Sequence, residues 1–92
     1  MKDAVLIKSF PNGITLLMRE DASMEEILQE LTVKFTEARN FFGSSTMALS
    51  MEGRKVTEAE EILILDTIRV NSNVRIACIV GHDDDTNKNF IK

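Results

Sequence analysis

The chain has 92 residues, of which 43% are hydrophobic and 28% are charged, and its formal net charge is −4. A chain of this length forms one small domain with a single core, and its acidic balance argues against binding to a nucleic-acid backbone. No apolar run in the sequence is long enough to cross a bilayer or to serve as a secretion signal, so we expect a cytoplasmic protein. The single cysteine excludes an internal disulfide.

The first predicted elements are two strands joined by a tight hairpin. Residues 4–10 are rich in Val, Leu and Ile, which favour strands, and residues 14–19 repeat this character. Between them lies Pro11-Asn12-Gly13, where proline presets a turn and both Asn and Gly tolerate a positive φ. The two strands are therefore expected to pair in antiparallel fashion.

A long amphipathic helix is predicted next. Ser23 and Glu26 have the spacing of a capping box, in which each side chain bonds the other residue's backbone N–H. Gly43 is the predicted end of the helical segment. The apolar residues that recur at spacings of three and four, and so form a stripe facing the core, are Met24, Ile27, Leu28, Leu31, Phe35 and Ala38.

The end of this helix carries two adjacent aromatic residues, Phe41 and Phe42. Neighbouring helical residues do not point in the same direction, so both rings cannot face one core. We expect Phe42 to pack inward and Phe41 to lie near the surface, with Lys34 to one side of the apolar stripe. Two interpretations remain open, namely a core satellite with a solvated lysine, or an aromatic anchor with a charged rim on a binding surface.

The second half of the chain predicts a strand, a helix and a last strand. Residues 46–51 alternate in polarity, a Gly53-Arg54 turn follows, and Thr57 with Glu60 forms a second capping box. Residues 62–65 are all apolar, so we expect the second helix to be well buried.

The last strand is predicted over residues 74–80 and is expected to place Cys78 in the core. Its predicted core face consists of Val74, Ile76, Cys78 and Val80, with Arg75 and Ala77 on the other face.

The predicted order is β-β-α-β-α-β, which indicates an α/β fold. We expect a two-layer sandwich with a mixed four-stranded sheet and two helices on one face, joined by right-handed crossovers. Residues 1–80 would form this domain. Residues 81–92 are polar and are expected to be a linker or tail that leads to an absent C-terminal domain.

No residue cluster in the sequence predicts catalysis, a metal or a cofactor. His82 with residues 83–85 does not make a closed coordination shell, because consecutive carboxylates lack the supporting partners that metal sites require. The only His and the only Cys are placed far from any nucleophile–base arrangement. The isolated glycines match no phosphate-binding loop. We therefore expect a protein that is not an enzyme.

The chain resembles the N-terminal domain of the septum-site-determining protein MinC over about residues 4–80. The sequence marks that carry this resemblance are, in chain order, Ile7-Lys8-Ser9, Asn12-Gly13-Ile14-Thr15-Leu16, Ile27-x-x-x-Leu31-x-x-Lys34-Phe35-x-x-Ala38-x-x-Phe41-Phe42, Met47-Ala48-Leu49-Ser50-Met51 and Gly53-Arg54-x-Val56-Thr57-x-x-Glu60. The resemblance implies an inhibitor of cell division whose N-terminal domain binds FtsZ and antagonises its polymers. Binding to MinD would belong to the C-terminal domain that this chain lacks.

The resemblance also implies which residues face FtsZ, namely Lys8, Ser9, Lys34, Ala38 and Phe41. The two lysines would offer positive charge, Phe41 would be an apolar anchor, and Ala38 would permit close approach. Ser9 departs from the family, which commonly has glycine at that position. The implied partner is a protein, with no nucleic acid and no direct membrane contact, and the domain itself would be a monomer or a weak or swapped dimer.

A second hypothesis rests on the fold alone. Small domains of this order include STAS-like regulators of the anti-sigma-factor-antagonist type, which carry a phosphorylatable Ser or Thr at the start of a helix. Ser23 and Thr57 occupy such positions here, although each also fits a capping box. Phosphorylation by a partner kinase would favour the STAS-like hypothesis, whereas binding to FtsZ without modification would favour the MinC-like one.

Overall fold

The computed structural model describes residues 3–80 and confirms the predicted order of elements, with one short helix added after the first. The elements are β1 (Val5–Phe10), β2 (Gly13–Met18), α1 (Met24–Glu37), α2 (Arg39–Phe42), β3 (Thr46–Glu52), α3 (Glu58–Asn71) and β4 (Arg75–Val80). The expected tail, residues 81–92, lies outside the described residues.

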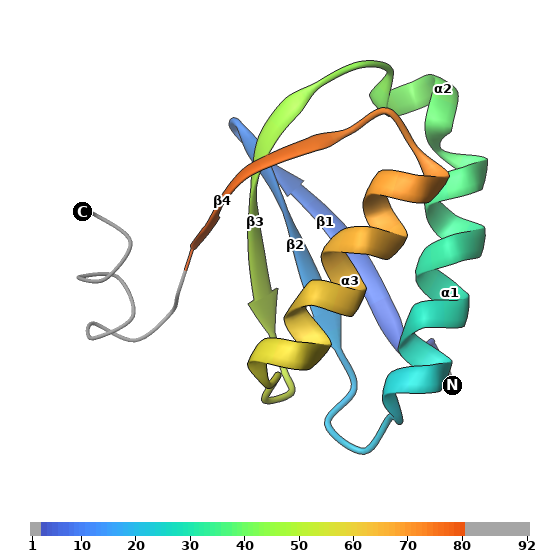
Figure 1. Cartoon of the computed structure of the whole chain (residues 1–92), viewed down its shortest axis with the longest axis vertical. Helices are drawn as coiled ribbons and strands as arrows, with labels where there is room; N and C mark the ends of the chain where they lie inside the picture. Colours follow the sequence, from blue (N-terminus) through green and yellow to red (C-terminus); the bar gives the residue numbers. More distant parts are fainter. Residues whose placement is uncertain (1–2, 81–92) are drawn as a thin grey trace.

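The strands form one mixed sheet in the order β1-β2-β3-β4. β1 pairs with β2 in antiparallel fashion, whereas β3 is parallel to both β2 and β4. The two long helices, α1 and α3, pack side by side on one face of this sheet (Figure 1). The predicted two-layer α/β sandwich is therefore confirmed, and the second face of the sheet carries no helix among the described elements.

The hairpin between β1 and β2 is shorter than the sequence suggested. Only Pro11 and Asn12 form the turn, and Asn12 alone adopts a positive φ, of 71°. Gly13 instead begins β2, where an added Cβ would lie 2.7 Å from the Ala48 carbonyl oxygen. Glycine is therefore required there because two backbones approach closely.

The core lies between the sheet and the two helices. Alternate residues of each strand point toward the helices, and α1 contributes Ile27, Leu31 and Phe35 while α3 contributes Ile64 and Ile68. The buried apolar residues are Ala4, Val5, Ile14, Leu16, Met18, Ala22, Ile27, Leu31, Phe35, Leu49, Ile64, Ile68 and Val74. Burial of this continuous surface is the main stabilising term in a domain of this size.

Both predicted capping boxes are present. The Ser23 hydroxyl accepts the Glu26 N–H at 3.1 Å, and the Glu26 carboxylate accepts the Ser23 N–H at 3.1 Å. Thr57 and Glu60 make the same pair of bonds, at 3.1 and 3.0 Å. Each box satisfies two backbone donors that a helix N-terminus leaves unpaired.

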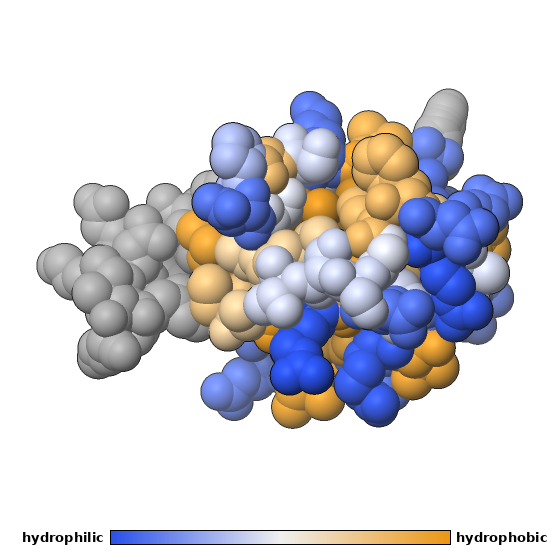
Figure 2. All heavy atoms as spheres, turned by 90° about the horizontal axis from the view of Figure 1, so that it is seen from above, coloured by the Kyte–Doolittle hydropathy of each residue, from blue (hydrophilic) through white to orange (hydrophobic). Residues whose placement is uncertain are grey.

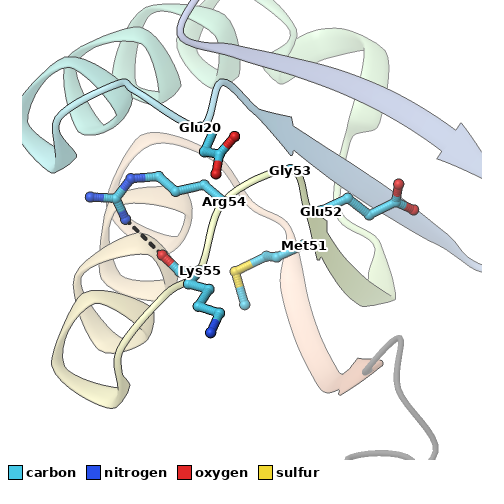
Figure 3. Close-up of a pocket in the computed structure, with 6 residues that line it drawn as sticks. All are labelled: Glu20, Met51, Glu52, Gly53, Arg54 and Lys55. Carbon is cyan, nitrogen blue, oxygen red and sulfur yellow. Dashed lines mark hydrogen bonds between the residues drawn. The ribbon is translucent and has the colours of Figure 1, made fainter.

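The Gly53-Arg54 turn joins β3 to α3 and closes one end of the core (Figure 3). Gly53 has a φ of 91°, and a Cβ there would lie 2.1 Å from the Met18 carbonyl oxygen. Arg54 donates to the carbonyl oxygens of Ala22 and Lys55, both at 2.9 Å, and contacts Glu60 at 3.2 Å. The turn is thus a structural connection between three parts of the chain.

Two packing predictions were wrong. Cys78 is exposed rather than buried, because Ala77 is an extra residue in β4 that pairs with no residue of β3. This bulge reverses the alternation of the strand, so that Cys78 pairs with Ala48 on the helix-free face. The helix α3 is not buried all round either, because it contacts the sheet with one stripe and leaves Ile62 64% exposed.

No helix within residues 3–80 has both the length and the apolar character needed to cross a membrane.

Candidate partner-binding surface

A shallow groove follows the free edge of β1, where this strand lies beside the second half of α1. Its volume is about 410 Å³. Apolar side chains of β1, of residue 38 and of α2 form most of its walls, and the second half of α1 contributes one lysine and one glutamate at its rim. The lining residues are Leu6, Ile7, Lys34, Glu37, Ala38 and Phe42.

One end of the groove is shaped by a break in the helix at Ala38. Residue 38 has φ −93° and ψ 6°, which ends α1, and the four-residue α2 follows. The break was not predicted, since the apolar spacing runs through it. The Phe42 N–H still bonds the Ala38 carbonyl at 2.9 Å, so α2 continues the chain closely from α1.

The two phenylalanines of α2 separate as predicted. Phe42 stacks on the buried ring of Phe35, with ring centroids 5.6 Å apart, while Phe41 is 82% exposed and meets Phe42 edge-on. In the view toward this end of the molecule, hydrophobic groups reach the surface among hydrophilic ones (Figure 2). An exposed ring held by a half-buried neighbour, which itself stacks on the core, is a preformed apolar projection.

The charge on the rim is partly compensated. The Lys34 ammonium lies 3.6 Å from the Asp3 carboxylate, and its side chain is 29% exposed. Because the Asp3 side chain of this pair is 53% exposed, the ion pair contributes little to stability.

The β1 residues of the predicted set lie on opposite sides of the strand. Lys8 pairs with Thr15 and points to the helix-free face, whereas Ser9 pairs with Ile14 and points to the face that carries the helices. Both residues are exposed, and neither lines the groove. Of the predicted set, Lys34 and Ala38 line the groove and Phe41 contacts its lining residue Phe42, whereas Lys8 and Ser9 lie outside it.

Four residues of the groove are absent from the predicted set, namely Leu6, Ile7, Glu37 and Phe42. Glu37 lies three residues after Lys34 and could have been assigned to the same helix flank from its spacing. Leu6 and Ile7 could not have been assigned to this surface from the sequence, because the sequence does not show that β1 is an edge strand beside α1.

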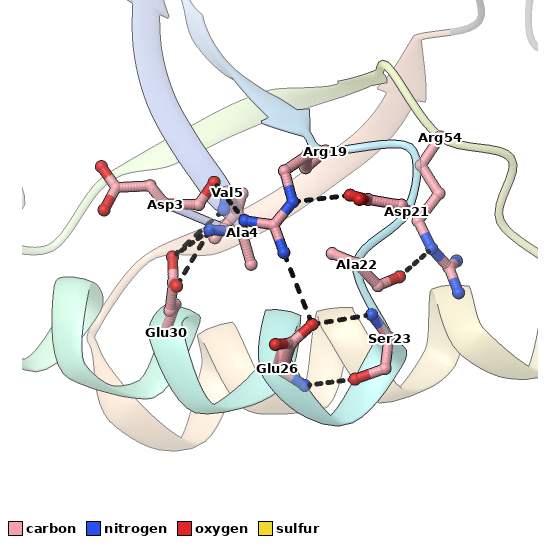
Figure 4. A network of polar contacts seen from close by, with 10 residues as sticks. All are labelled: Asp3, Ala4, Val5, Arg19, Asp21, Ala22, Ser23, Glu26, Glu30 and Arg54. Atoms are coloured by element: carbon pink, nitrogen blue, oxygen red, sulfur yellow. Dashed lines mark hydrogen bonds and ion pairs between the residues drawn. The ribbon is translucent and has the colours of Figure 1, made fainter. Parts of the chain in front are cut away.

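A polar network anchors the N-terminal end of this surface (Figure 4). The Glu30 carboxylate accepts the N–H of Ala4 at 2.8 and 2.9 Å and that of Val5 at 3.1 Å. Arg19 donates to Asp21 at 2.6 Å, and this hydrogen bond holds the pKa of the Asp21 carboxyl below its ordinary value. The network fixes the start of β1 against α1 and so fixes the walls of the groove.

The side chains of this surface are of kinds that occur at protein interfaces. Its polar groups are carboxylates and ammonium groups without a neighbouring nucleophile, and within residues 3–80 no three His, Cys, Asp or Glu side chains are grouped to hold a metal ion. What the surface offers is an exposed aromatic ring, an apolar groove and charged groups at its rim, which together are typical of protein interfaces.

Comparison with known proteins agrees with these features. Residues 5–79 match the family described as cell-division inhibitor MinC, N-terminal domain-like. The probable septum site-determining protein MinC of Lachnospira eligens is 36% identical over 85 residues, which are 92% of this chain and 35% of that protein. The protein of the same name from Agathobacter rectalis is 34% identical over 80 residues, or 87% of this chain and 33% of that protein.

A third relative, the probable septum site-determining protein MinC of Acetivibrio thermocellus, is 27% identical over 73 residues, or 79% of this chain and 32% of that protein. The chain thus spans about a third of the length of these curated relatives. No solved structure gives a significant match. Because the family match extends from β1 almost to the end of β4, the chain belongs to the MinC N-terminal domain-like family.

Proposed function

We propose that this domain takes part in placing the division septum, as an inhibitor that binds FtsZ and antagonises its polymers. Two observations support the proposal. The family to which the chain belongs is described as a cell-division inhibitor, and the relatives carry names that refer to the septum site. Phe41, one of the residues implied to face FtsZ, is 82% exposed although it is a large apolar side chain.

The exposure of Phe41 is the observation that carries the proposal. Large aromatic side chains are the residues that most often dominate binding energy at protein interfaces. Phe41 stands next to the groove and rests on Phe42, whose ring is fixed by Phe35. A partner that covers this ring would bury its apolar surface, and the cost in side-chain entropy would be small because the ring is already held in place.

The other residues of the set would support this anchor. Ala38 has a small side chain beside Phe42 in the groove, so a partner can approach the helix closely there. Lys34 at the rim would pair with acidic groups of FtsZ. Long-range attraction of this kind raises the rate of association and helps to orient the partner.

The STAS-like alternative gains no support from Ser23 and Thr57. Each hydroxyl accepts a backbone N–H within a complete capping box. Helix capping therefore accounts for both residues without a phosphorylation site.

The proposal is tested by sedimenting FtsZ assembled with GTP in the presence of the domain. Wild-type domain is expected to bind FtsZ and to lower the amount in the pellet. Phe41→Ala is expected to weaken binding by about 1 kcal/mol or more, which is about fivefold, as loss of an interface anchor does.

The matched control is Ile62→Ala, which removes an apolar side chain that is 64% exposed on α3. It is expected to leave binding unchanged. Full affinity of the Phe41 variant would refute the role of that ring, and absence of binding by the wild-type domain would refute the proposed partner.

A further inference from the structure

The two lysines implied to face FtsZ lie on opposite faces of the sheet. Lys34 belongs to α1, which covers one face, whereas the side chain of Lys8 points from β1 to the other face. A partner that lay flat on either face would reach only one of them. A partner that lay along the outer edge of β1 would reach both.

The hydrogen-bond pattern of β1 shows which backbone groups this edge presents. The Arg19 N–H bonds the Ala4 carbonyl at 2.8 Å, so the pair Ala4–Arg19 is a hydrogen-bonded pair of the antiparallel ladder. Such pairs alternate with pairs that do not bond across the ladder. Lys8 therefore bonds to β2, while Ile7 and Ser9 point their N–H and C=O groups outward.

These outward groups are available to a partner. Within residues 3–80, no hydrogen bond to the outward backbone groups of Ile7 or Ser9 is found. The same edge is closed at its N-terminal end, where the Glu30 carboxylate bonds the N–H groups of Ala4 and Val5 (Figure 4). Glu30 thus occupies the place that another strand would take and leaves the edge open from Ile7 onward.

The groove lies directly beside this open edge, on the side of the sheet that carries the helices. An added strand would point alternate side chains to the two faces of the sheet. The side chains on the helix side would enter the groove between Ile7, Ala38 and Phe42, so apolar side chains would fit best there. The side chains on the helix-free side would lie near Lys8, so an acidic side chain would fit best there.

The other edge of the sheet is less suited to strand addition. β4 contains the extra residue Ala77, and such a bulge interrupts the regular spacing of backbone groups. β1 pairs with β2 without interruption from Val5 to Phe10.

We propose that β1 accepts an extended segment of FtsZ as a fifth strand, in the groove between β1 and α1. The segment would pair its backbone with Ile7 and Ser9, place apolar side chains against Ala38 and Phe42, and present an acidic side chain to Lys8. This mode of recognition takes its affinity from main-chain bonds and its specificity from alternate side chains. It rests on the proposed binding to FtsZ, whose partner segment it specifies.

The test removes one outward N–H and leaves the rest of the strand in place. Proline is tolerated at edge positions whose N–H faces away from the ladder, so Ser9→Pro keeps the bonds between β1 and β2. Titration of FtsZ is expected to show binding by Ser9→Pro that is about tenfold weaker or more. Ser9→Ala removes only the hydroxyl and keeps the N–H, so the loss of affinity in Ser9→Pro is expected to exceed any loss in Ser9→Ala by about tenfold.

Amide exchange on the wild-type domain gives a second measurement that does not depend on folding of the proline variant. The amide protons of Ile7 and Ser9 are expected to exchange rapidly in the free domain and slowly in the complex. Lys8, whose N–H already bonds to β2, is expected to be protected in both states and serves as the internal control.

The outcomes separate the two proposals. If the wild-type domain binds FtsZ but Ser9→Pro binds equally well, or Ile7 and Ser9 gain no protection, strand addition is overturned and binding to FtsZ stands. If the wild-type domain does not bind, the proposed function fails and strand addition fails with it.

Discussion

Truncation of Leu31 to alanine tests whether the faces of α1 are assigned correctly. Leu31 is 0% exposed and lies in the core with Ile27 and Phe35, each four residues away from it along one stripe. Replacement of a fully buried leucine by alanine costs about 2 to 5 kcal/mol, because apolar area is lost and a cavity remains. We expect a loss of this size.

The loss is large for this domain. Single domains have total stabilities of about 5 to 15 kcal/mol, so Leu31→Ala is expected to remove a substantial part of the folding free energy. For a chain of this length each kcal/mol moves the thermal midpoint by roughly 4 to 8 °C. The variant is therefore expected to melt about 8 to 40 °C below the wild-type domain.

The assay is urea denaturation followed by circular dichroism, with Phe41→Ala as the matched variant of the same helical segment. Phe41 is 82% exposed and touches Phe42 only edge-on, so its truncation is expected to cost less than about 1 kcal/mol. An unchanged midpoint for Leu31→Ala, or an equal loss for both variants, would show that the assignment of core and surface on this segment is wrong.

Two further predictions concern the turn after β3 and the start of α3. Gly53→Ala is expected to destabilise the domain by about 2 kcal/mol or more, since a Cβ would lie 2.1 Å from the Met18 carbonyl oxygen. Gly43→Ala, at φ 59° and ψ −151° with no heavy atom within 4 Å, is expected to cost only backbone strain of about 1 to 3 kcal/mol, and a smaller loss for Gly53→Ala than for Gly43→Ala in thermal melts would contradict the clash at Gly53. The Thr57 N–H and then Arg54 hold the pKa of Glu60 below its ordinary value of 4.5, so this carboxylate stabilises the fold above pH 4.5 and the gain is lost as the pH falls below that value. In the Glu60→Gln variant, the thermal midpoint is expected to decrease less than in the wild-type domain as the pH falls below 4.5. The same pH dependence in both proteins would show that Glu60 makes no such contribution.

The order of elements and the helix starts followed from local chemistry. The capping boxes at Ser23 and Thr57 define helix starts through side-chain bonds that span only three residues, so the sequence alone contains the necessary information. The opposite orientations of Phe41 and Phe42 followed in the same way, because adjacent helical residues cannot share one face.

The errors arose where the outcome depends on contacts between distant segments. The bulge at Ala77 is a property of the pairing of β4 with β3, and without it the alternation predicts a buried Cys78. The exposure of Ile62 and Leu63 on α3 reflects how little of that helix meets the sheet, which the apolar run 62–65 does not reveal.

The candidate surface was only partly foreseeable for the same reason. Residues of one helix, such as Lys34 and Ala38, can be placed together from their spacing. That Lys8 lies across an edge strand from them, and that Leu6 and Ile7 complete the groove, depends on the order of strands in the sheet.

The central claim is that FtsZ binds along α2, the second half of α1 and the free edge of β1. It is tested most directly by recording the amide NMR spectrum of the labelled domain during titration with FtsZ. We predict that the largest changes fall on residues 6–9 and 34–42, with little change on the outer face of α3. Changes centred on the exposed apolar residues of α3, Ile62, Leu63 and Val70, would contradict the account, because the partner would then occupy the other apolar surface of the domain.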